Sequence, residues 1–173
     1  MYRAPVAKRV YLAGPDVFFK NVREHSAHLK EVCAKHGLEG LFPLDADVRI
    51  EASDSDLVKA HKIFVGNVAP IHQADGVLAN MVPFRGPSMD LGTAWEMGLA
   101  YGLGKPVVAF TDDMRLYHVR VEDWRSQTAP YLHDEHDVEN FGLLDNLMPV
   151  CGSACHAVES FEAAVVKMAE LLG

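Results

Sequence analysis

Residues 75–110 read DGVLANMVPFRGPSMDLGTAWEMGLAYGLGKPVVAF, and this stretch decides the fold class. It contains two short apolar runs, DGVLANMV at 75–82 and PVVAF at 106–110, which are typical of buried parallel strands. Between them, residues 90–103 follow a helical pattern that closes at Gly104. A strand, a helix and a second strand in this order predict two parallel strands joined by a helical crossover.

The flanking sequence continues the same alternation. Further strands are expected at 9–14, 38–43 and 156–158, and further helices at 20–36, 55–73 and 160–172. The sequence therefore predicts a single α/β domain over residues 1–173. It is expected to be a doubly wound, flavodoxin-like parallel sheet of about five strands with helices on both faces.

Two segments depart from regular patterning. Pro70 lies inside the helical pattern at 55–73, so this stretch is expected to be kinked or divided into two short helices. Residues 112–147 are polar and poorly periodic, and they are longer than a usual connection. Such a segment indicates a functional role or an interface.

Composition and charge restrict the partners of the chain. The formal net charge is −8, and 49% of the residues are apolar. A negatively charged protein is a poor partner for a phosphate backbone, so we expect no nucleic-acid polymer. We find neither an apolar run of membrane-spanning length nor the apolar core of a signal peptide, and therefore expect a cytoplasmic protein without a membrane partner. The three cysteines form no metal-ligand pattern, so no metal site is expected.

Glu96 is the one charged residue in the stretch 91–103, LGTAWEMGLAYGL. A helix that is apolar on every face is normally buried, and burial of an unpaired carboxylate is unfavourable or raises its pKa. The pattern therefore leaves two interpretations open. Glu96 forms a structural salt bridge, for example to Arg85 or Arg115, or it performs chemistry.

Asp90 opens the same helix at the edge of the sheet where the strands end. Its structural interpretation is an N-cap that accepts hydrogen bonds from free backbone N–H groups. Its functional interpretation is a second acid beside Glu96, because carboxylates near one another suit glycosyl chemistry. Ligands of open α/β sheets bind at this edge, where residues 14–18, 80–90 and 111–113 are expected.

Three blocks of sequence, in order, resemble the nucleoside 2-deoxyribosyltransferase family. The first is VYLAGPDVF at 10–18, and the third is VENFGLLDNLM at 138–148. The second spans residues 67–110, where PFRG is followed by Asp90, Gly92, Glu96 and Gly98 in a specific pattern. Together the blocks extend over most of the chain.

The resemblance implies roles for individual residues. Glu96 matches the nucleophile that forms a covalent deoxyribosyl-enzyme, and Tyr11 matches a tyrosine that orients it. Asp90 matches the acid that binds a hydroxyl of the deoxyribose. The base pocket is implied to be lined by Gly14 and Phe18.

The resemblance also implies an assembly and a reaction. Asn146 and Met148 match residues that reach into the active site of a neighbouring subunit, so a homo-oligomer is expected. The implied reaction transfers 2-deoxyribose between nucleobases by double displacement, with hydrolysis as a side reaction. Deoxynucleosides and free nucleobases are the expected partners, and no metal or organic cofactor is needed.

Two positions depart from the family pattern. Where many members have an aspartate that exchanges a proton with the base, this chain has Asn67, whose amide binds but cannot act as an acid. Asp16 stands where a small residue is expected, which affects the shape of the base pocket.

Two alternative functions remain open. Related proteins of the same fold hydrolyse 2'-deoxynucleoside 5'-monophosphates, but they commonly have a small hydroxyl residue at the position of Asp90. A carboxylate there repels a phosphate dianion and favours a free nucleoside. The second alternative is a non-catalytic nucleoside-binding module, since doubly wound sheets serve many binders.

Overall fold

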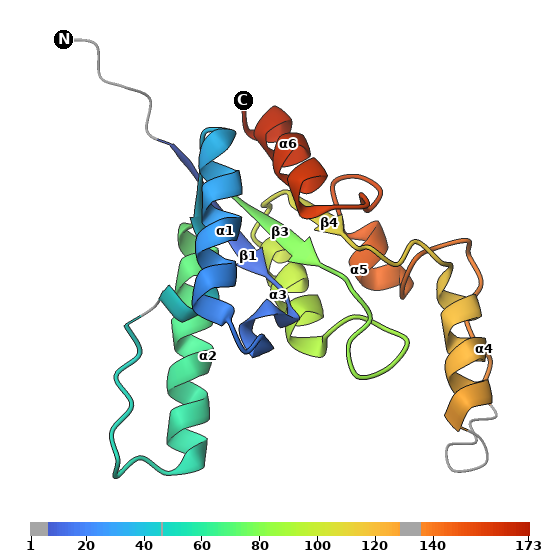
Figure 1. Ribbon diagram of the computed structural model, residues 1–173, viewed down its shortest axis with the longest axis horizontal. Coiled ribbons are helices and arrows are strands. Elements are labelled where there is room, and N and C mark those ends of the chain that lie inside the picture. Colours follow the sequence, from blue (N-terminus) through green and yellow to red (C-terminus); the bar gives the residue numbers. More distant parts are fainter. Residues whose placement is uncertain (1–6, 46, 129–135) are drawn as a thin grey trace.

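The computed structural model describes residues 7–45, 47–128 and 136–173. One sheet of four parallel strands has the order β2-β1-β3-β4 (Figure 1). The strands are β1 (Lys8–Ala13), β2 (Leu38–Leu41), β3 (Gly76–Asn80) and β4 (Val107–Phe110). The helices of the described residues are η1 (Pro15–Phe18), α1 (Val22–Lys35), η2 (Pro43–Asp45), α2 (Asp56–Gln73), α3 (Leu91–Gly102), α4 (Tyr117–Thr128), α5 (Leu147–Cys151) and α6 (Phe161–Leu172).

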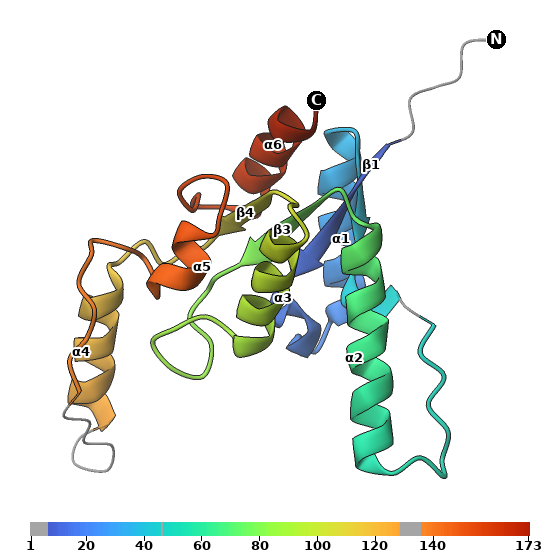
Figure 2. The same cartoon turned by 180° about the vertical axis from the view of Figure 1, so that it is seen from behind.

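Side chains alternate between the two faces of the sheet, because successive residues of a strand point to opposite sides. In β1, Val10 and Leu12 pack against α1 and α6, whereas Tyr11 and Ala13 pack toward α2 and α3. Figures 1 and 2 show these two helix pairs on opposite sides of the strands. The predicted doubly wound fold with helices on both faces is confirmed.

The prediction of about five strands is wrong by one. Residues near Val158 form an isolated parallel bridge to Phe110 instead of a strand. Two backbone hydrogen bonds, Val158 to Ala109 and Thr111 to Val158, make this bridge. Only one residue separates Val158 from Ser160, which caps α6 by accepting from Ala163 N at 3.2 Å. The chain therefore has no length for a further strand.

The division of 55–73 into two short helices, one of the two forms expected there, is also wrong. After the N-cap Ser55, α2 runs without interruption to Gln73 and includes Pro70. Proline removes one backbone N–H from the helical ladder. Pro70 lies in the last turn, so few hydrogen bonds remain to be formed beyond it, and its carbonyl still accepts from Ala74 N.

The segment 112–147 was expected to be irregular, but it contains the twelve-residue helix α4. This helix lies at one margin of the molecule, beyond α5 (Figures 1 and 2). Its buried residues are Arg120 and Val121, and Arg120 is paired with Asp145 at 3.2 Å. Because one of its two buried residues is the charged Arg120, α4 lacks the apolar stripe that sequence periodicity detects.

None of the helices formed by the described residues has the length and apolar character needed to cross a membrane.

Candidate active site

Glu96 and Tyr11 meet between α3 and the central strand β1. Tyr11 is fully buried on the face of the sheet that α3 covers, and its hydroxyl donates a hydrogen bond of 2.6 Å to Glu96 Oε1. Glu96 is partly buried on the second turn of α3. This pairing holds one carboxylate oxygen, while Oε2 has no hydrogen-bond partner among the described residues.

Burial raises the pKa of Glu96 from its ordinary value to about 7. The hydrogen bond from Tyr11 lowers this pKa, and the nearby charge of Asp90 raises it. Burial, followed by the charge of Glu96, raises the pKa of Tyr11 above its ordinary value. Tyr11 therefore stays protonated as the donor, while Glu96 gains or loses a proton near neutral pH.

Asp90 is the N-cap of α3, with φ −63° and ψ 134°. Its Oδ2 accepts from Thr93 N at 3.0 Å and from Thr93 Oγ1 at 3.2 Å. The structural interpretation is therefore correct. It does not exclude the functional one, because Oδ1 has no hydrogen-bond partner in the described part of the chain. Since Asp90 lies outside the helix, its charge reaches Glu96 despite the six-residue spacing.

Gly92 provides room beside this carboxylate. A Cβ at Gly92 would lie 3.0 Å from Asp90 Oδ2, which is closer than a carbon and a carboxylate oxygen normally approach. Gly92 also borders a pocket of about 280 Å³ on the surface of α2 and α3. The residues that line this pocket are Phe64, Asn67, Val68, Gly92, Trp95 and Glu96. The structure thus brings Asn67 and Glu96 to one cavity.

Two aromatic side chains form a wall of this pocket. Phe64 and Trp95 pack edge to face, with ring centroids 5.4 Å apart, and about half of each side chain is exposed. The expectation that α3 is buried on every face is wrong for the single chain, because Leu91 and Tyr101 are also exposed. A sheet covers only one side of a helix, so the opposite side of α3 stays accessible.

Gly14 and Phe18 lie at the same edge of the sheet, on the turn that follows β1, but outside the Glu96 pocket. Phe18 stacks on Phe84 with ring centroids 5.3 Å apart, and the guanidinium of Arg85 covers both rings. Arg85 has φ +57°, which is uncommon for a residue with a side chain. The PFRG loop and the turn after β1 are therefore held together by aromatic contacts.

Asp16 is buried beneath the turn and does not point into open solvent. Its carboxylate contacts His25 Nε2 at 2.6 Å and accepts from Asn80 Nδ2 at 2.9 Å. These bonds join the turn after β1 to α1 and to the end of β3. A Cβ at Gly14 would lie 2.3 Å from Asp16 Oδ2, so this close approach requires glycine at position 14.

Asn146 and Met148 lie away from the pocket that holds Glu96 of the same chain. Asn146 caps α5, and both residues border a separate pocket of about 450 Å³ between α3 and α5. This second pocket also includes Gly98 and Tyr101 of α3. Met148 is 73% exposed. Within a single chain these two predicted residues are not brought to the candidate site.

The salt-bridge interpretation of Glu96 is wrong. Arg115 pairs with Asp113 at 2.6 Å and with Asp123 at 2.9 Å, whereas Arg85 covers aromatic rings. Glu96 is instead held by the neutral hydroxyl of Tyr11. A neutral donor leaves the carboxylate charge uncompensated, which suits chemistry better than a salt bridge does.

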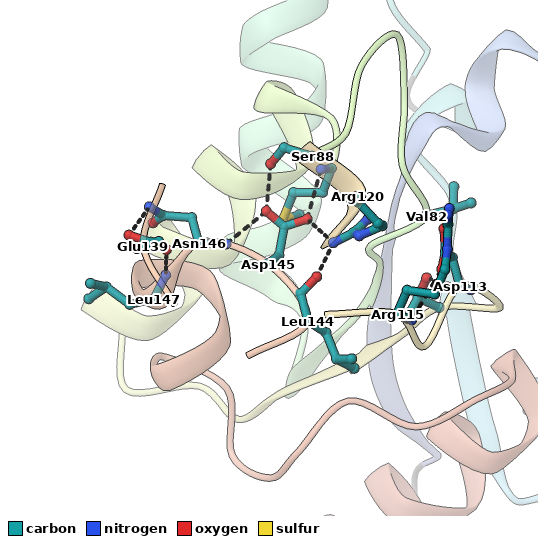
Figure 3. Close-up of polar contacts among 12 residues, drawn as sticks. Val82, Ser88, Asp113, Arg115, Arg120, Glu139, Leu144, Asp145, Asn146 and Leu147 are labelled. Carbon is teal, nitrogen blue, oxygen red and sulfur yellow. Dashed lines mark hydrogen bonds and ion pairs between the residues drawn. The ribbon is translucent and has the colours of Figure 1, made fainter. Parts of the chain in front are cut away.

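Sequence reasoning missed the buried Asp145, which joins the segment before α3 to the segment before α5 (Figure 3). The clue was its position directly before Asn146, in a block already singled out. Neither its burial nor its partner Arg120 can be read from local patterning.

A larger pocket of about 590 Å³, lined in part by Asp45 and Arg49, lies along α2 and lacks Glu96.

Comparison with known proteins assigns the family. The family model described as nucleoside 2-deoxyribosyltransferase matches residues 10–148, which include Tyr11, Asp90 and Glu96. The chain belongs to the nucleoside 2-deoxyribosyltransferase family. This membership confirms the resemblance predicted from the three sequence blocks.

Solved structures of nucleoside 2-deoxyribosyltransferases share the fold. A 2-desoxiribosyltransferase from Leishmania mexicana is 30% identical, with a TM-score of 0.72 over 94% of this chain and 97% of that chain. A 2-deoxyribosyltransferase from Bacillus psychrosaccharolyticus is 25% identical, with a TM-score of 0.50 over 67% and 81% of the respective chains. A conserved protein from Enterococcus faecalis V583 shares the fold at 20% identity, with a TM-score of 0.59 and coverage of 96% and 99%.

Among curated sequences, an uncharacterized protein of Schizosaccharomyces pombe is 37% identical over 119 residues. The match covers 68% of this chain and 56% of that relative. The chain thus spans little more than half the length of this curated relative.

Proposed function

We propose that the chain transfers 2-deoxyribose between nucleobases, with Glu96 as the covalent nucleophile. The observation that carries this proposal is the hydrogen bond from Tyr11 to Glu96 Oε1, which leaves Oε2 without a partner among the described residues, at the border of a pocket. A carboxylate that is fixed through one oxygen presents the other in a defined direction. Such positioning lowers the entropic part of the barrier to attack on a bound sugar.

The first displacement breaks the bond between the sugar and the base. Ionised Glu96 attacks the anomeric carbon with an electron pair of Oε2, which forms a carbon–oxygen bond. The glycosidic carbon–nitrogen bond breaks, and its electron pair leaves with the base. Positive charge develops at the anomeric carbon as this bond breaks. The negative charge of Glu96 is poorly solvated, because burial raises its pKa, so bond formation to the carbon neutralises an unfavourable negative charge.

The second displacement restores the enzyme. A nitrogen of a different base attacks the same carbon from the vacated side and gives up its proton to water, and the electron pair of the carbon–oxygen bond returns to Glu96. Two inversions give net retention of configuration, as in retaining glycosidases. Water in place of the base gives free deoxyribose. Neither step requires an external oxidant, reductant or metal.

Asn67 interacts with the base at the start and the end of this cycle. It borders the same pocket as Glu96. Its amide can donate a hydrogen bond to a base nitrogen but cannot supply a proton as an acid. We infer that the base departs as an anion held by this hydrogen bond and takes its proton from water.

Asp90 selects the sugar part of the substrate. Its Oδ1, which has no partner in the part of the chain that the structure describes, can accept a hydrogen bond from a deoxyribose hydroxyl, while Oδ2 remains bound to Thr93. The carboxylate also disfavours a 5'-phosphate at this place through charge repulsion. We therefore propose free deoxynucleosides and nucleobases as the substrates.

A second copy of the chain completes the site in this proposal. The side of α3 that faces away from the sheet is apolar and exposed, with Leu91 86%, Tyr101 67% and Trp95 50% accessible. Contiguous apolar surface of this kind is typical of protein interfaces. Asn146 and Met148 border the pocket on this side of α3 and would enter the neighbour's active site.

Base exchange tests the proposed reaction directly. The protein is mixed with a 2'-deoxynucleoside and a different free base, and new deoxynucleoside is measured by chromatography. Glu96→Gln retains the shape of the side chain but lacks a nucleophilic oxygen. We expect it to reduce exchange by about 10³-fold or more. The matched control is Glu31→Gln, which changes an exposed carboxylate on α1 that pairs with Lys35.

Other products would contradict the proposal. Turnover limited to 2'-deoxynucleoside 5'-monophosphates, with release of free base, would identify the hydrolase alternative. Tight binding of deoxynucleoside with no turnover would identify a binding module. Exchange that survives Glu96→Gln would assign the nucleophile elsewhere.

A further inference from the structure

A single buried carboxylate, Asp145, holds together two segments that the proposed function places in two different active sites. Asp145 is 1% exposed. Its Oδ1 accepts from Ser88 Oγ at 2.5 Å and from Asn146 N at 2.8 Å. Its Oδ2 accepts from Met89 N at 3.0 Å and from Arg120 Nη2 at 3.2 Å. Figure 3 shows the two segments converging on this side chain.

Both segments carry a proposed substrate-binding residue directly next to this carboxylate. Met89 immediately precedes Asp90, the N-cap of α3. Asn146 immediately follows Asp145 and caps α5. A displacement of the Asp145 carboxylate would therefore move the backbone on one side of Asp90 and on one side of Asn146.

Arg120 of α4 places a positive charge beside the Asp145 carboxylate in the interior. The guanidinium is 3% exposed, and it also donates to the carbonyl of Leu144. Removing one partner of a buried ion pair leaves the other charge uncompensated, which is strongly destabilising. Asp145 is thus held by four donors in one position.

Glu139 fixes the remaining freedom of Asn146. Its two carboxylate oxygens accept from Asn146 Nδ2 at 3.1 Å and from Leu147 N at 2.8 Å. The side chain of Asn146 is therefore oriented before any neighbour is met. Asp145 holds the backbone of Asn146 and Glu139 holds its side chain, so Asn146 has a fixed conformation within its own subunit.

We propose that Asp145 is a positioning residue for two active sites at once, setting Asp90 in its own subunit and Asn146 in the site of a neighbouring subunit. The proposal rests on the function proposed above. Through the Asp145 network (Ser88, Met89, Arg120, Asp145 and Asn146), each subunit couples the sugar site that it owns to the residue that it lends. Loss of the carboxylate acts on substrate binding on both sides of the interface.

Mixed oligomers separate the two effects. Differently tagged subunits are co-expressed and purified through both tags. The reference pairs Glu96→Ala with Asn146→Ala, so that the one competent site has Glu96 from the second subunit and Asn146 from the first. The own-site cross pairs a Glu96→Ala subunit with an Asp145→Asn subunit, so that the competent site has Glu96 and the substituted residue 145 in the same subunit. The lending cross pairs a subunit that carries both Glu96→Ala and Asp145→Asn with an Asn146→Ala subunit. Its competent site therefore receives Asn146 from the subunit in which residue 145 is substituted.

Base exchange with a deoxynucleoside and a free base is then measured for each mixture. In both crosses we expect KM for the deoxynucleoside to rise about tenfold over the reference, which corresponds to one lost hydrogen bond. A purely structural role of Asp145 would lower the unfolding temperature but leave KM unchanged well below it. Either cross with the KM of the reference would overturn the proposal.

A milder substitution keeps the test decisive if Asp145→Asn does not fold. Ser88→Ala removes one donor to the oxygen that also binds Asn146 N, and it leaves the Arg120 ion pair in place. Ser88→Thr retains the hydroxyl and is the matched control. We expect Ser88→Ala, but not Ser88→Thr, to raise KM in both crosses. Equal KM values for the two variants would overturn the proposal.

Failure of the proposed function gives a different result from failure of this inference. If the unmodified protein performs no base exchange, the proposed function is wrong. If the unmodified protein is active but the reference mixture is not, no residue is lent across the interface, and the role of Asp145 in two sites is refuted.

Discussion

The hydroxyl of Tyr11 lies 2.6 Å from Glu96 Oε1, although 85 positions separate these residues in the chain. Tyr11 is fixed in the centre of the sheet, and Glu96 belongs to the helix that covers it. The hydrogen bond therefore holds the carboxylate against the buried central strand of the sheet. Burial at the same place raises the pKa of Glu96 to about 7.

The proposed nucleophile must be ionised, so the rate of base exchange should follow the titration of Glu96. We expect kcat/KM to rise as the pH increases, to reach half its maximum near pH 7, and to level off above pH 8. A profile measured from pH 5 to pH 9 with one deoxynucleoside and one base tests this. Constant kcat/KM from pH 5 to pH 7 would contradict the assignment.

Tyr11→Phe removes the hydrogen bond that lowers the pKa of Glu96. The midpoint of the pH profile should move to higher pH, and exchange at pH 7 should fall about tenfold. Part of the loss should be recovered at pH 9, where Glu96 is again ionised. A loss of the same size at every pH would show that Tyr11 acts by other means.

The raised pKa of Glu96 also predicts a pH-dependent stability. Below the ordinary pKa the carboxyl is protonated in both the folded and the unfolded chain, and its favourable contribution is fully present. This contribution is lost as the pH rises through the folded value of about 7. Relative to the unmodified protein, Glu96→Gln should therefore gain stability between pH 4 and pH 8, by at most about 3 kcal/mol.

Urea unfolding at the two pH values measures this gain. The control is Glu31→Gln, whose exposed carboxylate has its pKa lowered by the hydrogen bond from Lys35. That substitution should not produce a gain at pH 8. A Glu96→Gln variant that loses stability at pH 8 relative to pH 4 would be inconsistent with the buried acid.

Asp90→Ser should shift substrate preference from nucleosides toward 5'-monophosphates. Serine is also a good N-cap, so α3 should keep its first turn. The loss of a negative charge should raise turnover of a deoxynucleotide relative to the matching deoxynucleoside by about tenfold. Parallel assays of the two substrates measure this ratio. An unchanged ratio would mean that other groups select against phosphate.

Gly14→Ala should destabilise the turn that follows β1. The new methyl group would lie 2.3 Å from Asp16 Oδ2 and 2.8 Å from Asn80 Cβ. We expect a loss of about 1–3 kcal/mol in the free energy of unfolding, as for other overpacked sites. Gly102→Ala, at a position with no atom within 4 Å of its new Cβ, is the matched control. Equal stability of the two variants would refute the close approach.

Local patterning predicted the elements that position the site. Short apolar runs that alternate with helical segments located β1, β3 and β4, and the glycine at 104 marked the end of α3. The N-cap role of Asp90 followed from its place before an apolar helix. These features depend on neighbouring residues in the chain, so the sequence contains them directly. The resemblance to the family then singled out Glu96 as the candidate nucleophile.

Patterning failed where long-range contacts replace local preference. The helix α4 has little amphipathic character because a buried ion pair between Arg120 and Asp145 anchors it. The run near Val158 was too close to the cap of α6 to extend into a strand. Trp95 lies half-exposed beside the pocket although its helix is apolar in pattern, because only one side of α3 meets the sheet.

The sequence by itself determined the parallel α/β architecture and the isolated acid at position 96. The tertiary structure alone decided that a neutral tyrosine holds Glu96, and that Asp145 joins the segments next to Asp90 and Asn146. The physical reason is that hydrophobic periodicity and capping act within one element. A hydrogen bond between residues 85 or 56 positions apart exists only after the elements have packed.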